Sequence, residues 1–120
     1  MSDRDPRVML REMVESIRAV RLYLQGVSKE EFINSALVQD AVIRRIEILG
    51  EAANQIPDAV KQRFPEVEWR EISAMRNRLI HGYFSVNIEV VWNTAEHDLT
   101  PLEAHAQAML SQLVQEAQGG

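Results

Sequence analysis

The residues best suited to chemistry gather in one short segment, Arg76-Asn77-Arg78-Leu79-Ile80-His81-Gly82-Tyr83. Guanidinium groups are permanently charged and offer paired donors to phosphate oxygens, imidazole exchanges a proton near neutral pH, and a phenol can bond to a phosphate or sugar. RNA supplies its own nucleophile, the ribose 2′-hydroxyl, so a site need only remove that proton, stabilise charge on phosphorus and protonate the leaving oxygen. The segment therefore predicts RNA cleavage that needs no metal.

Helix geometry sets a condition on this chemistry. On a regular helix Asn77 and His81 share a face, whereas Arg76 and His81 are about 140° apart around the axis. They converge if the arginine side chain wraps round the helix, if the helix loosens at His81-Gly82, or if a two-fold related copy faces the segment across a shared cleft. We favour the dimeric cleft, because two copies of Arg76, Arg78 and His81 would locally offset the acidity of the chain.

A purely structural interpretation of the same segment stays open. Leu79 and Ile80 would then be core residues, the arginines would be solvated, and His81-Gly82 would simply end a helix. Tyr83, taken alone, also fits a half-buried packing residue.

Length and composition predict one globular domain spanning residues 1–120, with a frayed tail from about residue 114. The chain has 120 residues, 46% of them hydrophobic and 26% charged, and a formal net charge of -5. That charge argues against a general nucleic-acid coat protein. However, Arg63, Arg70, Arg76 and Arg78 lie close together in the sequence, and no Lys or Arg follows Arg78. Any RNA contact is therefore expected to be local.

The chain has no cysteine, which excludes disulfides, thiolate metal sites and cysteine nucleophiles, and fits the cytoplasm. The longest apolar run near the N-terminus, Val8-Met9-Leu10, is far too short for a signal peptide or a membrane span. His97 and His105 lie among acidic residues but lack a compact ligand spacing. We therefore predict a cytoplasmic protein with no membrane association, metal or cofactor.

Apolar residues recur at helical spacing and predict an all-α fold with essentially no strand. Asp5-Pro6 begins a helix that reaches about Gly26, and Ser28 to Glu31 form a capping box before a short helix. Asn34 or Ser35 caps a long helix to about Gln55, with Pro57 ending it. Further helices are expected from Asp58 to before Pro65, from about Glu66 to Gly82, and from Asn87 onward, where Thr100-Pro101 either starts a new helix or, as we favour, kinks the existing one.

The long central helix carries a polar stripe beside its buried face, made of Asp40, Arg44, Glu47 and Glu51. This stripe fits a solvated or ion-paired surface. It also fits the wall of the RNA cleft, with Arg44 and Arg78 contacting phosphate and the two glutamates orienting the histidine or arginines. Gly50, in the middle of the helix, is best explained by the close approach of another backbone.

The segment matches the R-x4-H-x-Y motif, through Arg76, His81 and Tyr83, and the chain resembles HepT-like toxins, a branch of the HEPN superfamily of helical ribonucleases. The resemblance extends over nearly the whole chain, through residues 45–53, Pro65 with residues 69–72, and residues 75–83, 91–92 and 98–102. It implies an all-α, HEPN-type helical bundle of up-and-down helices, with a short extra helix between the long ones. It also implies a homodimer with a composite cleft, acting on RNA and paired with a minimal nucleotidyltransferase antitoxin.

Residue by residue, the resemblance implies that Arg76 stabilises the scissile phosphate and His81 acts as general base or acid. Asn77, the polar residue that follows the arginine in this family, would orient them. Tyr83 matches the tyrosine that the antitoxin adenylylates, which would silence the toxin of this type VII-like pair. The alternatives are a non-catalytic helical dimer that serves as the nucleotide-binding or regulatory subunit of a nucleotidyltransferase, and a plain dimerisation module.

Overall fold

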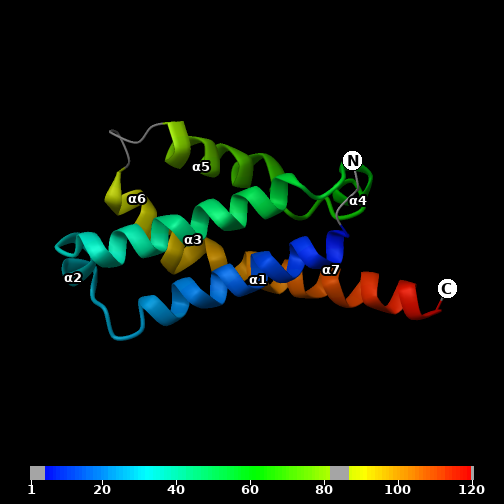
Figure 1. The fold of residues 1–120 in the computed structure, drawn as a ribbon, viewed down its shortest axis with the longest axis horizontal. Coiled ribbons are helices and arrows are strands. Elements are labelled where there is room, and N and C mark those ends of the chain that lie inside the picture. Colours follow the sequence, from blue (N-terminus) through cyan, green and yellow to red (C-terminus); the bar gives the residue numbers. More distant parts are fainter. Residues whose placement is uncertain (1–4, 82–86, 120) are drawn as a thin grey trace.

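Helices make up most of residues 5–81 and 87–119, the part of the chain that the computed structural model describes. Figure 1 shows their order: α1 (Pro6–Tyr23), α2 (Lys29–Ile33), α3 (Ala36–Asn54), α4 (Asp58–Lys61), α5 (Trp69–His81), α6 (Ile88–Asn93), the π-helical segment η2 (Thr94–Asp98) and α7 (Leu99–Gly119). No strand occurs within these ranges. The prediction of an all-α fold with short helices between long ones is confirmed.

The long helices form an elongated bundle with principal-axis extents of 51 × 29 × 25 Å. α3 packs against α1 on one side and against α5 on the other, and α7 runs along α1 (Figure 1). α5 returns antiparallel to α3. The candidate chemistry on α5 is therefore positioned chiefly by α3.

The side chains that begin the helices are the ones expected from the sequence. Asp5 accepts a hydrogen bond from the backbone of α1, Ser28 and Glu31 form the complete capping box of α2, and Ser35 caps α3. Asn87 caps α6 by accepting from two backbone N–H groups. Each cap satisfies donors that the first helical turn leaves unpaired, which explains why these boundaries were predictable.

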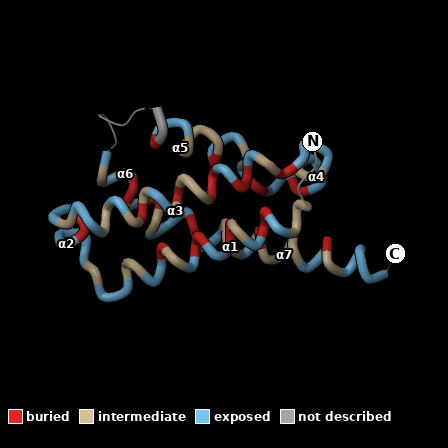
Figure 2. Tube along the Cα trace, in the orientation of Figure 1, coloured by how far each residue is buried: buried red, intermediate tan, exposed pale blue. Residues whose placement is uncertain are grey.

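The core is built from the predicted apolar faces. Figure 2 shows buried positions along the sides of the long helices that face one another. The fully buried large side chains come from α1, α2, α3, the segment after α3, and α7, and are Met9, Leu10, Met13, Ile17, Val20, Phe32, Val42, Ile46, Leu49, Ile56 and Met109. Phe32 also contacts the Trp92 ring at a centroid distance of 5.4 Å, which ties α2 to α6.

Several boundaries differ from the sequence prediction: α1 ends at Tyr23 instead of about Gly26, and α4 ends at Lys61 instead of just before Pro65. α5 begins at Trp69 instead of about Glu66, because the preceding turn is held separately: the Val67 backbone N–H and the Trp69 indole N–H both donate to the Phe64 carbonyl. α7 continues as helix through Gly119, and fraying of the tail from about residue 114 stays a prediction. Burial of Leu113 and an ion pair between Arg63 and Glu116 hold this helix against the body of the protein.

At Pro101 the chain stays helical, but with altered hydrogen bonding. The π-helical segment η2 directly precedes α7, in which Pro101 is the third residue. Proline lacks an N–H and its ring crowds the carbonyl four residues earlier, which belongs to His97. A π-helical turn at that point is a common way for a helix to absorb such a break.

Stability at acidic pH should depend on the cap of α1. Hydrogen bonds from the side chain and backbone of Arg7 lower the pKa of Asp5 from 3.8 to about 2. A carboxyl whose pKa is lower in the folded state stabilises the protein fully above its unfolded pKa and loses that effect as pH falls through the folded pKa. Asp5→Asn keeps a capping oxygen but not the charge. We expect wild type to exceed it in free energy of unfolding above about pH 4, with the difference shrinking as pH falls and vanishing below the folded pKa of about 2, as measured by urea denaturation.

Candidate active site

The side chain of Arg76 packs against the backbone of α3 at Gly50, which has no side chain of its own. A Cβ atom built on Gly50 would lie 2.4 Å from the Cβ and 2.7 Å from the Cγ of Arg76. Real Cβ atoms do not approach that closely, so only glycine permits the two helices to meet here. The expected close approach at Gly50 is confirmed, and its partner is the candidate phosphate-binding arginine.

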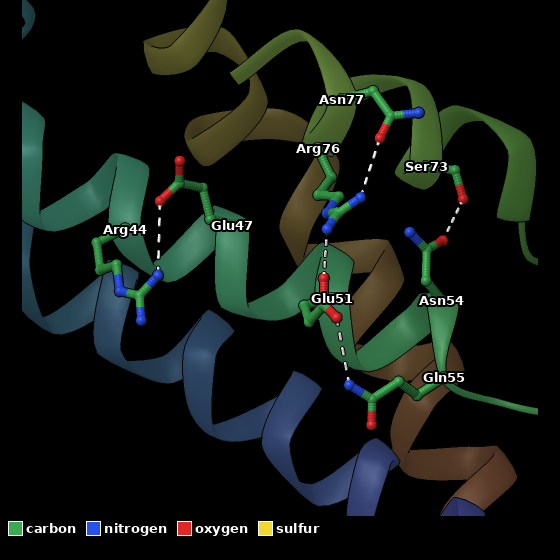
Figure 3. A network of polar contacts seen from close by, with 8 residues as sticks. All are labelled: Arg44, Glu47, Glu51, Asn54, Gln55, Ser73, Arg76 and Asn77. Atoms are coloured by element: carbon green, nitrogen blue, oxygen red, sulfur yellow. Dashed lines mark hydrogen bonds and ion pairs between the residues drawn. The ribbon is translucent and has the colours of Figure 1, made fainter. Parts of the chain in front are cut away.

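The Arg76 guanidinium is held at both terminal nitrogens (Figure 3). Nη2 donates to Glu51 Oε2 at 2.5 Å, and Nη1 donates to Asn77 Oδ1 at 3.1 Å. Nε is buried and has no hydrogen-bond partner among the described residues. The side chain of Arg76 is 24% exposed and that of Glu51 is 50% exposed. The guanidinium is thus fixed near the surface.

A second polar contact joins α3 and α5 one turn away. Ser73 Oγ donates to Asn54 Oδ1 at 2.5 Å, and Gln55 Nε2 donates to Glu51 Oε1 at 3.4 Å (Figure 3). Ser73, Asn54 and Gln55 were not predicted from the sequence. A signal was present, because polar residues on both helices recur at the three- and four-residue spacing of a single helical face.

Arg44 and Glu47 lie on α3 but apart from Arg76. They form an ion pair at 3.8 Å within one helix, with the Arg44 side chain 72% exposed. Together with Glu12 and Glu51 they line a hollow of about 380 Å³ between α1 and α3. Among the described residues this hollow carries three carboxylates and one guanidinium. Within a single chain, Arg44 is therefore surrounded mainly by negative charge.

Arg78 lies on a different face of α5 from Arg76. It lines a groove of about 300 Å³ whose other wall comes from η2 and α7, with Asp98 and His105. Two residues along a helix correspond to about 160° of separation around the axis, which explains the split. The structure therefore brings Asn77, Glu51 and Arg76 together, but it does not bring Arg78 or Arg44 to the same guanidinium.

The remaining candidates lie at the end of α5 and beyond it. His81 is the last residue of that helix, so the backbone is helical from Arg76 to His81 and does not loosen between them. Tyr83 and Gly82 lie outside the described residues. Positions 76 and 81 are thus about 140° apart on one helix, as regular geometry requires.

No group of three or more His, Cys, Asp or Glu side chains is placed to hold a metal ion among the side chains that the structure describes, those of residues 5–79 and 87–119. Nor does any helix in those ranges combine the length and apolar character needed to cross a membrane.

The R-x4-H spacing on which the resemblance to HepT-like toxins was based lies on α5 of this helical bundle. A family model described as "Ribonuclease HepT-like" matches residues 13–109. The chain belongs to the HepT-like ribonuclease family. This confirms the resemblance stated from the sequence.

Individual relatives agree with the family match. A "Probable ribonuclease HepT" of Thermococcus cleftensis is 38% identical over 94 residues, covering 78% of this chain and 86% of that protein. A "Putative RNase" of Methanocaldococcus jannaschii is 35% identical over 103 residues, covering 86% and 94% respectively. Another, of Caldanaerobacter subterraneus, is 31% identical over 105 residues, covering 88% and 94%. No solved structure matches the chain.

Proposed function

We propose that the chain is an endoribonuclease that cleaves RNA without a metal ion and acts as the toxin of a type VII-like toxin–antitoxin pair. Family membership supports the ribonuclease class. The observation that carries the proposal is the setting of Arg76, whose guanidinium is held near the surface by two side chains and retains further N–H groups. A fixed, partly exposed guanidinium is suited to a phosphate whose charge rises in the transition state.

In this mechanism the ribose 2′-hydroxyl attacks the adjacent phosphorus. His81 either accepts the proton of that hydroxyl or donates a proton to the departing 5′-oxygen, and solvent water makes the other proton transfer, while Arg76 stabilises the charge on the phosphoryl oxygens. Asn77 orients Arg76 through the hydrogen bond already described. The P–O5′ bond breaks, and the products are a 2′,3′-cyclic phosphate and a 5′-hydroxyl end.

The catalytic unit is proposed to be a homodimer. Arg76 packs toward α3 and is held there by Glu51, while position 81 lies about 140° further round the same helix. The arginine of one chain and the histidine of its two-fold partner could share one groove without distorting α5. A second chain would also bring further cationic side chains, such as Arg44 and Arg78, to the RNA.

A minimal nucleotidyltransferase is the proposed antitoxin, and Tyr83 is its proposed acceptor. Attaching AMP two residues from His81 would add bulk and negative charge beside the groove, and both would repel an RNA phosphate. After co-expression with a neighbouring nucleotidyltransferase, mass spectrometry should find AMP on Tyr83. Tyr83→Phe should remain unmodified and toxic in the presence of that enzyme. AMP only on other residues would contradict this part of the proposal.

The nuclease proposal itself is tested with the purified protein. The protein should cleave RNA with EDTA present and leave cyclic phosphate ends, and its expression alone should arrest growth. No cleavage in EDTA together with harmless expression would overturn the proposal. Calorimetric binding of a nucleotide without cleavage would instead indicate the regulatory-subunit alternative.

A further inference from the structure

We infer, on the basis of the function proposed for Arg76, that Glu51 is a positioning residue for the reaction. Gly50 beside it provides the surface against which the base of the Arg76 side chain packs. These two consecutive residues of α3 contact opposite ends of one side chain from α5. Together they fix where the guanidinium lies before any RNA arrives.

The Gly50 contact fixes the base of the side chain. With the Cβ and Cγ of Arg76 pressed against the α3 backbone and the side chain only 24% exposed, few rotamers fit. An arginine loses considerable rotamer freedom when it is ordered. Here that ordering accompanies folding, so it does not oppose RNA binding, and the cation is preorganised for the transition state.

The Glu51 contact fixes the tip. The carboxylate takes one N–H from Nη2, and Asn77 takes one from Nη1. A guanidinium has five N–H groups, so each terminal nitrogen keeps one more that can point to a phosphate. The acceptors hold two different nitrogens and come from two different helices, which defines the orientation of the guanidinium plane.

The charge of Glu51 has a second consequence. A carboxylate 2.5 Å from the guanidinium nitrogen offsets part of the positive charge that attracts RNA, and it repels phosphate itself. Glu51 should therefore raise the catalytic rate by holding Arg76 and at the same time weaken RNA affinity. A residue that only stabilised the fold would not raise the catalytic rate and weaken RNA affinity at the same time.

Glu47 provides a matched control on the same helix. It lies four residues from Glu51, carries the same charge and lines the same hollow, but its ion pair is with Arg44 at 3.8 Å. Glu47→Gln therefore removes an equal charge nearby, without removing the acceptor that holds Arg76.

The test combines kinetics with a measurement that needs no activity. On a labelled RNA oligonucleotide, Glu51→Ala should lower kcat about tenfold or more. Glu51→Gln, which keeps an oxygen acceptor, should hold kcat within about threefold and lower KM. Glu15→Gln, which removes an equal charge from the exposed face of α1, should leave kcat unchanged. In ¹H–¹⁵N NMR, the Arg76 Nε–H signal should exchange slowly with solvent in wild type and in Glu47→Gln, and faster in Glu51→Ala.

The outcomes separate this inference from the proposed function. Wild-type kcat in Glu51→Ala, or an Arg76 Nε–H exchange rate that Glu51→Ala leaves unchanged, would overturn the positioning role. An exchange rate that rises in Glu51→Ala as expected, while Arg76→Ala cleaves RNA as fast as wild type, would preserve the positioning of the arginine and reject the nuclease mechanism.

Discussion

Arg76→Ala is expected to reduce the rate of RNA cleavage by roughly 10² to 10³-fold, because it removes the donor that stabilises the transition-state charge. The fold should survive, since alanine keeps the Cβ atom that rests on Gly50. The carboxylate of Glu51, already 50% exposed, can be solvated once its partner is lost. The measurement is the observed cleavage rate with EDTA present, together with growth after induced expression.

Arg70→Ala is the matched control for that variant. Arg70 lies on the same helix, carries the same charge and is exposed. Its loss should leave cleavage within about twofold and change the unfolding free energy by less than about 0.5 kcal/mol. If the two alanine variants lost activity equally, the effect of Arg76 would be one of net charge, and no specific contact with the phosphate would be needed.

The helices were predictable because their signals are local. Asp5-Pro6, Ser28 with Glu31, and Asn87 each satisfy backbone donors within their own first turn, and such caps can be read without knowing the rest of the fold. The ion pair of Glu116 with Arg63 could not be predicted in this way, because it joins residues distant in sequence. The late start of α5 likewise depends on a contact with the carbonyl of Phe64.

In the candidate site, too, the local features could be predicted from the sequence and the contacts between helices could not. The types and spacing of Arg76, Asn77 and His81 indicated phosphate chemistry, and a mid-helix glycine at position 50 indicated a close neighbour. Neither pattern stated that the neighbour of Gly50 is Arg76 itself. Sequence proximity also suggested that Arg78 would accompany Arg76, whereas helical rotation places it in the groove beside α7. Roles depend on residue type, but convergence depends on the packing of α3 against α5.

Gly50→Ala is the substitution that tests that packing most directly. An ordinary contact begins at 3.4 Å and the added Cβ would meet the Arg76 Cβ at 2.4 Å, so α3 and α5 must separate locally by about 1 Å. A displacement of that size at a catalytic group can cost about 10²-fold in rate. Overpacking costs about 1–3 kcal/mol, while alanine returns about 1 kcal/mol of helix propensity. We therefore expect a modest loss of stability beside a large loss of cleavage.

Gly119→Ala separates the packing effect from a general effect of replacing helical glycine. A Cβ at Gly119 would meet nothing within 4 Å, so both the cleavage rate and the midpoint of thermal unfolding should stay at wild-type values. For Gly50→Ala the cleavage rate is compared well below its unfolding midpoint, where the variant is folded. If Gly50→Ala cleaves RNA at the wild-type rate under these conditions, the guanidinium tolerates a shift of α5. Its contact with α3 then does not set the geometry of the reaction. A loss confined to cleavage would instead tie the rate to the distance between the two helices, because no side chain of the site has been removed.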